Sequence, residues 1–404
     1  MMFEFDFLVI GGGAAGYFAA INAARNFPNI KIAILEKNRE VLQKVKVSGG
    51  GRCNVTNAIT EPSELIKNYP RGHEFLLEPF ERFGSKDVFS WFEKRGIRLK
   101  IEKDGRAFPE SNSSQTIIDC FLYESTGIRL FTSERVENIV KKGSFWEIST
   151  NSEKIFTTKK ILIATGSDKR IWEILNNMNI KISPQAPSLF TFNIKDEKLN
   201  ELQGVSFPNA TVRILNTEFE QSGPLLITHW GLSGPAILKL SAWAALELKA
   251  KDYIFKITVN WLPELQKDKV LNEFRLNLES NSKKNVLANP MFGLTARFWK
   301  YICEKSGIAE HQKWAETGKK HFQALAENLL SAKYEVNGKS TFKEEFVTAG
   351  GIELSEIESE TFASKNHENL FFAGEILNID AVTGGFNFQA AWTGGWHVAK
   401  SLGF

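Results

Sequence analysis

The stretch that decides the fold is Phe5-Asp6-Phe7-Leu8-Val9-Ile10-Gly11-Gly12-Gly13-Ala14-Ala15-Gly16, near the start of a 404-residue sequence. Residues 5–10 are predicted to form a short strand, because apolar residues face both sides as a parallel sheet requires. The glycines follow the spacing G-x-G-x-x-G, and an alanine-rich stretch over 17–26 predicts a helix. A second strand over 31–35 ends at Glu36, twenty residues after Gly16. This order is typical of a dinucleotide-binding βαβ unit.

Each part of this unit has a physical role in binding a dinucleotide. Gly11 makes the tight turn, Gly13 lets the backbone approach a pyrophosphate, and Gly16 lets the helix pack closely on the strand. The helix N-terminus adds unpaired N–H groups and the positive end of a dipole. Glu36 can accept hydrogen bonds from ribose hydroxyls, which argues against a cofactor with a 2′-phosphate. The unit by itself leaves FAD and NAD as alternatives.

Composition excludes several classes of protein. Hydrophobic residues make up 43% and charged residues 24%, so the chain is neither disordered nor fibrous. The net charge of +3 is too small to favour a nucleic-acid partner on electrostatic grounds. Cys53, Cys120 and Cys303 lie far apart with no C-x-x-C, which disfavours a disulfide framework, a dithiol redox pair and a cysteine-based metal site. The acidic start and short apolar runs predict a cytoplasmic protein without a membrane span.

A second glycine-rich stretch reads Ser48-Gly49-Gly50-Gly51-Arg52-Cys53-Asn54-Val55-Thr56-Asn57. It is no second Rossmann turn, because Asn54 stands where the third glycine belongs and no buried strand precedes it. Three consecutive glycines permit a backbone path that suits close approach to a flat ring or a phosphate. Arg52 adds a fixed cation and Cys53 a soft thiol. The alternative interpretation is a mobile glycine loop with no ligand.

The segment Lys46–Asn57 resembles the signature of the BaiN-like (YhiN-type) bacterial NAD(P)/FAD-dependent oxidoreductases, which are related to the fumarate reductase and succinate dehydrogenase flavoproteins. The resemblance implies that this loop lies along FAD. A buried strand that ends in Ala164-Thr165-Gly166 is similar to the A-T-G motif of FAD enzymes. A strand over 369–373 leads into Gly374 and Glu375, as in the family segment that lies against the ribityl–pyrophosphate part of FAD.

The last motif is Thr383-Gly384-Gly385-Phe386-Asn387-Phe388-Gln389-Ala390-Ala391-Trp392, which opens a predicted helix to about Leu402. Its N-terminus would stabilise a reduced flavin, and Asn387 and Gln389 could bond the pyrimidine edge. A return of the chain to the nucleotide favours FAD, bound tightly and non-covalently, over NAD. The expected cofactor-binding residues are Gly11, Gly13, Ala14, Ala15, Gly16, Glu36, Lys37, Ser48, Gly50, Gly51, Arg52, Cys53, Val136, Thr165, Gly166, Gly374, Glu375, Asp380, Gly384, Gly385, Phe386, Asn387 and Gln389. No metal is expected.

The predicted fold class is α/β, with a Rossmann-like FAD-binding domain made of two chain segments and an insert between them. The FAD-binding domain comprises 1–187 and 346–404, as the family resemblance also implies. A β-rich domain is expected over 188–262 and 332–345, with strands over 188–194, 210–215, 223–228, 253–260 and 332–336. A helical subdomain is expected over 263–331, with helices over 265–278 and 292–306 and a helical continuation over 308–331.

The best substrate-side motif is Thr228-His229-Trp230-Gly231-Leu232-Ser233-Gly234-Pro235, which is similar to a motif of the same family. His229 is a candidate proton donor beside flavin N5, although a histidine that caps a turn fits equally. Arg52 is the second catalytic candidate, because a guanidinium can orient a carboxylate or a carbonyl. The loop after Gly166 turns quickly into a helix, unlike the longer glycine-rich stretch of many family members.

These observations predict an FAD-dependent oxidoreductase that transfers a hydride between flavin N5 and a small unsaturated or carbonyl substrate. Steroid-like enones are the substrates that the resemblance implies. NAD(P)H is expected only as a transient donor, because the chain holds no second G-x-G-x-x-G. One alternative is a flavin-dependent RNA-modifying protein, since residues 250–345 carry 16 Lys and Arg against 12 Asp and Glu. The other is a non-enzymatic flavin-binding sensor. The oligomeric state stays open.

Overall fold

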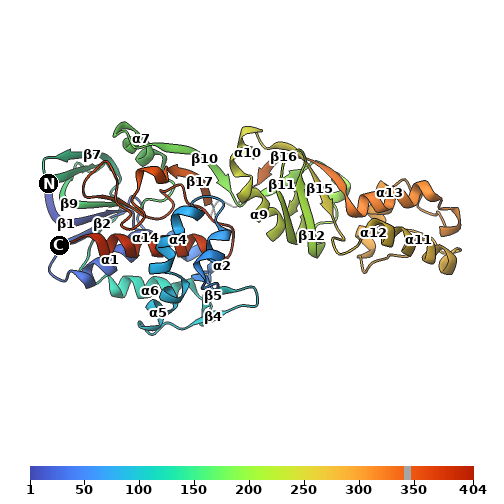
Figure 1. Cartoon of the computed structure of the whole chain (residues 1–404), viewed down its shortest axis with the longest axis horizontal. Helices are drawn as coiled ribbons and strands as arrows, with labels where there is room; N and C mark the ends of the chain where they lie inside the picture. Colours follow the sequence, from blue (N-terminus) through green and yellow to red (C-terminus); the bar gives the residue numbers. More distant parts are fainter. Residues whose placement is uncertain (341–346) are drawn as a thin grey trace. The chain divides into compact units, whose positions relative to one another are not determined.

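A computed structural model describes residues 1–340 and 347–404. The chain divides into two compact units, 1–187 with 343–404 and 188–342. The first unit is built on a mixed sheet covered by helices, and the second on a closed barrel (Figure 1). This architecture confirms the predicted fold class, a Rossmann-like domain of two chain segments with a β-rich insert. The finer division of the insert at residue 263 stays a prediction.

The sheet of the first unit runs in the order β6-β2-β1-β9-β8-β7, with β18 also paired to β9. Strands β1 (Met2–Ile10), β2 (Ile32–Leu35), β6 (Arg129–Phe131), β9 (Ile155–Ile163) and β18 (Leu370–Phe372) are parallel. Strands β7 (Val136–Lys142) and β8 (Phe145–Thr150) extend the sheet in antiparallel sense. The returning strand β18 pairs only with the end of β9, where Phe372 is in register with Ile163. The C-terminal segment of the chain therefore adds a parallel strand to the sheet that the N-terminal segment forms.

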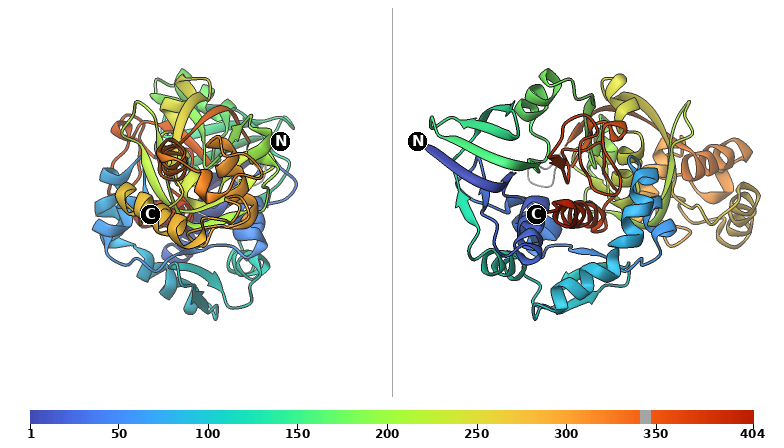
Figure 2. Two further views of the ribbon diagram at one scale, coloured as in Figure 1. Left: turned by 90° about the vertical axis from the view of Figure 1, so that its right-hand side faces the viewer. Right: turned by 60° about the vertical axis from the view of Figure 1, so that its left-hand side comes forward.

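Helix α1 (Ala14–Asn26) packs against α14 (Phe386–Ser401), as two views show (Figure 1, Figure 2). A Cβ atom at Gly395 would lie 2.9 Å from the carbonyl oxygen of Ala15, so only glycine permits this approach. The rings of Phe18, Trp91 and Trp392 form an aromatic core beside these helices. The other helices of the unit are α2 (Gln43–Gly51), α3 (Pro62–Leu65), α4 (His73–Arg82), α5 (Ser85–Glu93), α6 (Ser114–Glu124) and α7 (Lys169–Asn177).

Two small sheets complete the first unit. One consists of β3 (Thr56–Asn57), β5 (Arg106–Pro109) and β4 (Leu99–Ile101), with β5 in the middle. The other pairs β10 (Ile182–Ser188) with β17 (Val347–Ile352). The first of these sheets is important below, because β3 directly follows the second glycine-rich stretch.

The second unit is a closed antiparallel barrel in the order β11-β14-β13-β12-β15-β16. Its strands are β11 (Thr191–Ile194), β12 (Ser206–Ile214), β13 (Glu220–Thr228), β14 (Gly231–Ser233), β15 (Ile254–Asn260) and β16 (Ala332–Ser340). Its helices are α8 (Glu197–Asn200), α9 (Pro235–Trp243), α10 (Ala245–Ala250), α11 (Lys267–Asn281), α12 (Ala296–Lys305) and α13 (Lys319–Leu330). Trp261, Trp299 and Trp314 are buried in its core, as tryptophans at helical spacing usually are.

Three local expectations were wrong or incomplete. The strand expected over 188–194 is broken, because Leu189 has a φ of +57° between β10 and β11. The helix expected over 308–331 begins only at Lys319. Before it, Trp314–Glu316 form only a 3-10 turn, and the N–H of Trp314 donates to the carbonyl of Lys284 at 3.1 Å, so part of this backbone pairs with another segment. The second glycine-rich stretch begins inside α2, whose Ser48, Gly49 and Gly50 depart from helical geometry. The start of the last expected domain segment, residue 346, lies outside the described residues.

Candidate functional site

The predicted cofactor residues of the first unit follow four parallel strands at their carboxyl ends. Gly11 follows β1, Glu36 follows β2, Thr165 follows β9 and Gly374 follows β18. Parallel strands end at one edge of a sheet, which is where open α/β sheets bind ligands. The N–H of Ala164 donates to the carbonyl of Ile10 at 2.7 Å, which ties the first two turns together.

The three glycines of the first turn have different surroundings. A Cβ at Gly11, whose φ is +112°, would lie 2.3 Å from the carbonyl oxygen of Ala164. A Cβ at Gly16 would lie 2.0 Å from the carbonyl oxygen of Gly11. A Cβ at Gly13 would meet nothing within 4 Å. The first and third glycines are therefore required for packing, whereas Gly13 leaves the backbone open to a ligand. It is the N-cap of α1, and no side chain caps that helix, so first-turn N–H groups face a potential phosphate.

Glu36 lies beside this turn and accepts two backbone hydrogen bonds. Its Oε2 accepts from the N–H of Gly12 and its Oε1 from the N–H of Asn38, both at 2.8 Å. Each carboxylate oxygen keeps a further acceptor position, which suits a pair of ribose hydroxyls. The neighbouring Lys37 is paired with Asp168 at 2.7 Å. Val136 is buried at the start of β7.

The second glycine-rich stretch has an unusual backbone. The φ angles of Gly49, Gly50 and Gly51 are +58°, +67° and +81°, all in the left-handed region. A Cβ at Gly49 would lie 2.9 Å from Cε1 of Phe108, whereas one at Gly50 or Gly51 would meet nothing within 4 Å. This stretch therefore offers bare backbone on one side and is packed on a buried ring on the other. It fits close approach to a flat cofactor.

Cys53 has a different environment from a reactive thiol. The residue is buried, and burial raises the pKa of its thiol to about 12, against the smaller lowering effect of a hydrogen bond with Ser48. The hydroxyl of Ser48 donates to the carbonyl of Val45 at 2.9 Å. The thiol is therefore protonated at neutral pH, and Cys53 contributes packing and not a nucleophile.

The last residues of this stretch, which follow its glycines, connect it to the C-terminal motif, and the sequence analysis assigned Asn54 and Asn57 no individual role. Nδ2 of Asn57 donates to the carbonyl of Gly384 at 3.0 Å. Oriented to satisfy its neighbours, the amide of Asn54 accepts from the N–H of Gly385 at 2.9 Å. A Cβ at Gly385 would lie 2.4 Å from the carbonyl oxygen of Thr56. Their position directly after the glycines was the available signal, since asparagines commonly bond a neighbouring turn.

The other C-terminal residues close the same region. A Cβ at Gly374 would lie 3.0 Å from the Cβ of Ala15 at the start of α1. Glu375 accepts from the N–H of Thr348 at 2.8 Å and forms an ion pair with Lys44 of α2. A Cβ at Gly166 would lie 3.8 Å from Oε2 of Glu375, so the turn after β9 also reaches this point.

Four of the predicted cofactor residues already form hydrogen bonds or ion pairs within the protein. Asp380 is fully buried and makes an ion pair with Arg71, including a contact of 2.5 Å to Nη2. Asn387 exchanges two hydrogen bonds of 3.0 Å with the backbone of Ala381. Gln389 is buried and bonds the hydroxyls of Thr56 at 2.6 Å and Thr393 at 3.1 Å. The carbonyl of Phe386 accepts from Tyr69 at 2.6 Å. What α14 offers a ligand is thus its N-terminus, where Gly385 provides no capping side chain.

The two catalytic candidates are in different units. Nη1 of Arg52 donates to Oε1 of Glu102 at 2.6 Å, and its guanidinium lies 4.0 Å above the centre of the Phe108 ring. His229 is exposed in the turn between β13 and β14, with its ring against that of Trp230 at 4.0 Å. No hydrogen bond of His229 to any described residue is recorded, so it does not cap that turn.

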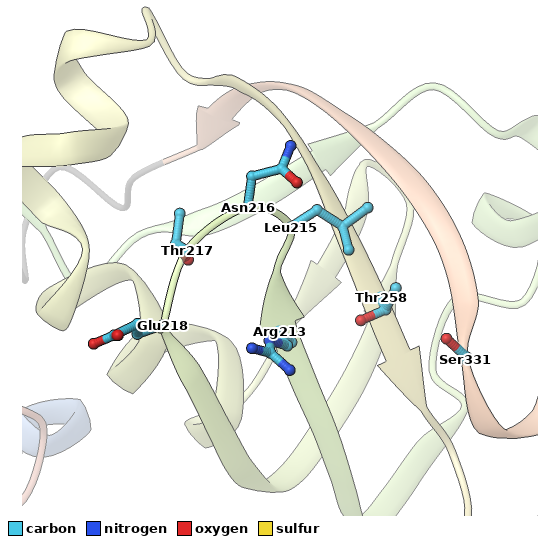
Figure 3. A pocket seen from close by; sticks show the side chains of 7 residues that line it. All are labelled: Arg213, Leu215, Asn216, Thr217, Glu218, Thr258 and Ser331. Atoms are coloured by element: carbon cyan, nitrogen blue, oxygen red, sulfur yellow. The ribbon is translucent and has the colours of Figure 1, made fainter.

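One cavity of about 630 Å³ lies on the second unit, beside β12 and β15 (Figure 3). It is open and polar, lined by Arg213, Leu215, Asn216, Thr217, Glu218, Thr258 and Ser331, and contains none of the predicted site residues. Within the described ranges, no group of three His, Cys, Asp or Glu side chains is arranged to hold a metal ion. No described helix is both long and apolar enough to cross a membrane.

The sheet edge, the bare glycines and the two uncapped helix N-termini fit FAD, and with this fold they define a Rossmann-type FAD-dependent oxidoreductase. The chain belongs to the family described as HI0933-like protein Rossmann domain, whose model matches residues 5–401. This confirms the resemblance that we recognised at Lys46–Asn57, and it sets aside the non-enzymatic alternative.

Two relatives match over nearly the full length. The ribosomal RNA dihydrouridine synthase of Escherichia coli is 28% identical over 99% of this chain and 98% of its own length. The 3-dehydro-bile acid delta(4,6)-reductase of Clostridium scindens is 26% identical over 97% of this chain and 98% of its own. Among solved structures, the 3-ketosteroid delta1-dehydrogenase of Sterolibacterium denitrificans shares the fold at a TM-score of 0.52, with 11% identity over 99% of each chain.

Proposed function

We propose that the protein reduces a C=C bond conjugated to a carbonyl group, with FAD as its tightly bound, non-covalent cofactor and NAD(P)H as a transient donor. One observation carries this proposal: two full-length relatives act, by their names, on unrelated molecules that share this bond. Dihydrouridine is uridine with hydrogen added to the ring C=C bond next to a carbonyl. A 3-oxo bile acid with unsaturation from C4 presents the same conjugated arrangement.

Several residues of this chain would bind the cofactor. Backbone N–H groups at Gly13, Ala14 and Ala15 would bind the pyrophosphate, and Glu36 would bind the ribose. The bare backbone at Gly50 and Gly51 would lie along the cofactor.

When bound and reduced by NAD(P)H, the flavin would supply a hydride for the carbon of the C=C bond farther from the carbonyl. The electron pair of that bond moves onto the carbonyl oxygen, and a proton completes the reaction at the nearer carbon. Arg52 would stabilise the charge on the oxygen, because a guanidinium is a fixed cation that donates in a plane. His229 stays the predicted proton donor, as a titratable side chain exposed on the second unit.

Two substrate classes follow from this chemistry. We propose a small enone as the first, in agreement with the prediction from sequence. Uracil in ribosomal RNA is the second, because the relatives from Escherichia coli and Haemophilus influenzae are both named ribosomal RNA dihydrouridine synthase. The net charge of +4 over residues 250–345, from 16 basic and 12 acidic side chains, is compatible with either an RNA or a small anion.

The test uses the purified protein with FAD, reduced without oxygen by NADPH or NADH. The reduced protein is mixed with 2-cyclohexenone, with a 3-oxo-4-ene steroid, or with unmodified ribosomal RNA, and the return of oxidised flavin absorbance is followed. We expect at least one acceptor to reoxidise the flavin faster than anaerobic buffer, with the saturated product formed in equal amount. Failure of all three, or a protein that binds no FAD, would contradict the proposal.

A further inference from the structure

Arg52 is held by three contacts on the second glycine-rich stretch. Its Nη1 donates to Oε1 of Glu102 at 2.6 Å, and its Nε donates to the carbonyl of Gly49 at 3.4 Å. The guanidinium also lies 4.0 Å above the centre of the Phe108 ring, within the range of a cation–π interaction. Among the residues that the structure describes, Nη2 has no protein acceptor, and the side chain is 33% exposed. The arginine is fixed on two sides and presents its remaining donors to a ligand.

The platform beneath Arg52 is rigid. Phe108 is fully buried in β5, and its Cε1 lies 2.9 Å from the position of a Cβ at Gly49. The ring therefore contacts both the glycine backbone that would lie along FAD and the guanidinium above it. A change in the position of Arg52 would have to move a buried ring or break the pair with Glu102.

Glu102 directly follows β4 in the β4–β5 hairpin, where its N–H donates to the carbonyl of Arg106 at 2.8 Å. Its Oε2 accepts from Nη2 of Arg106 at 3.2 Å, so one carboxylate bridges two arginines. Arg106 has a second carboxylate partner in Asp104, at 2.8 Å from Nε, whereas the structure shows Arg52 paired with Glu102 alone. Glu102 therefore fixes Arg52, and Asp104 offers a control that contacts only the other arginine.

We propose that Glu102 is a positioning residue for Arg52: it holds the guanidinium over Phe108, so that Nη2 receives the oxygen that becomes negative when the conjugated C=C bond is reduced. This proposal rests on the proposed function and deepens it. A misplaced donor loses much of its effect on a developing charge, since such effects depend on geometry fixed before the reaction. The side chain of Glu102 acts through Arg52 and does not contact the substrate.

The first experiment separates the two acceptors of the reduced flavin. Stopped-flow reoxidation is measured with oxygen and with the fastest of 2-cyclohexenone, the 3-oxo-4-ene steroid and unmodified ribosomal RNA. Rates are taken per bound flavin and divided by each variant's own rate with oxygen. On this scale we expect Arg52→Gln to slow reoxidation by that acceptor about 100-fold or more and Glu102→Ala about 10-fold. Asp104→Ala should behave as the wild type.

The double variant Arg52→Gln/Glu102→Ala provides the readout that a structural role would not give. We expect it to be no slower than Arg52→Gln, because Glu102 has nothing left to position. Additive losses, or a rate of Glu102→Ala equal to or above that of the wild type, would overturn the proposal. If no acceptor other than oxygen reoxidises the wild type, the proposed function itself has failed. This outcome differs from failure of the positioning role, in which the wild type reacts with an acceptor but the variants do not behave as expected.

A measurement without turnover completes the test. 4-Nitrophenolate carries a negative oxygen on a conjugated ring, and its absorbance reports its ionisation. We expect the oxidised protein to bind it, with about 10-fold weaker affinity in Glu102→Ala and about 100-fold weaker in Arg52→Gln. Equal affinity of the wild type and Arg52→Gln would overturn the assignment of the negative oxygen to Arg52.

Discussion

Replacement of Gly13 by valine separates cofactor binding from folding. A Cβ at Gly13 meets no atom within 4 Å, and the residue has φ of −93° and ψ of −168°, an extended conformation that any residue adopts. The protein without cofactor should therefore lose at most about 1 kcal/mol, because valine is a poorer N-cap than glycine by about that amount and the reduced freedom of the unfolded chain offsets part of the loss. The added side chain occupies the path of the pyrophosphate, so we expect FAD retention to be abolished.

Gly16→Ala is the matched comparison. Its Cβ would lie 2.0 Å from the carbonyl oxygen of Gly11, well inside van der Waals contact, and the atom it meets is backbone. Such overpacking costs about 1–3 kcal/mol or more, because helix α1 must move away from β1. We expect this variant to unfold at lower denaturant whether or not FAD is present.

The assay is thermal unfolding with and without added FAD, together with the flavin absorbance that remains after gel filtration. FAD at about 100 times its dissociation constant should stabilise the wild type by about 2.7 kcal/mol, and Gly13→Val should show none of this. Wild-type retention of FAD by Gly13→Val would refute the reasoning, and so would loss of the fold without cofactor.

Three further predictions concern buried groups. Asp380→Asn should lower the free energy of unfolding by about 3–5 kcal/mol in urea, because it breaks the ion pair of the fully buried carboxylate with Arg71. Asp104→Asn, on an exposed pair, should cost less than about 1 kcal/mol. Cys53 should resist alkylation at pH 8 until the protein unfolds. Burial raises the pKa of its thiol to about 12, so only about one molecule in 10⁴ carries the thiolate at this pH. Rapid labelling of the native protein would contradict this prediction. Burial lowers the pKa of His397, so folding stability should fall as the pH drops below about 6.5, the value in the unfolded chain, and His397→Gln should flatten that slope in pH-dependent denaturation.

The nucleotide domain was predictable because its signals are local. Strand, glycine turn, helix and acid follow one another within 32 residues, and their hydrophobic periods do not depend on distant contacts. Closure of the insert into a barrel was not predictable, since pairing of β11 with β16 joins Phe192 to Lys339 across most of the insert. The missing helix over 308–318 has the same cause, because its backbone bonds to the segment around Lys284.

Within the candidate site, the sequence indicated which segments meet but not which way their side chains point. Asn387 and Gln389 were expected to reach a flavin, yet both have protein partners, because the preceding turn aims that face of α14 at Thr56 and Ala381. Glu102 and Phe108 escaped notice, since they come from a hairpin fifty residues after Arg52 and carry no motif.

The distribution of these roles explains how one family can act on different molecules. The features of this chain that fit FAD are mostly backbone: bare glycines at 13, 50 and 51 and two uncapped helix N-termini. Such features tolerate wide variation of the surrounding side chains, because a peptide N–H is present whatever residue carries it. Side chains that would discriminate substrates are then few in the first unit. Arg52 on the glycine-rich stretch and Glu102 on the β4–β5 hairpin form such a pair, with 33% and 29% of their side chains exposed. We therefore expect exchange of residues 188–340 with those of a relative to leave FAD retention unchanged, because the backbone features that fit FAD all lie in the first unit; loss of FAD from the exchanged protein would contradict this.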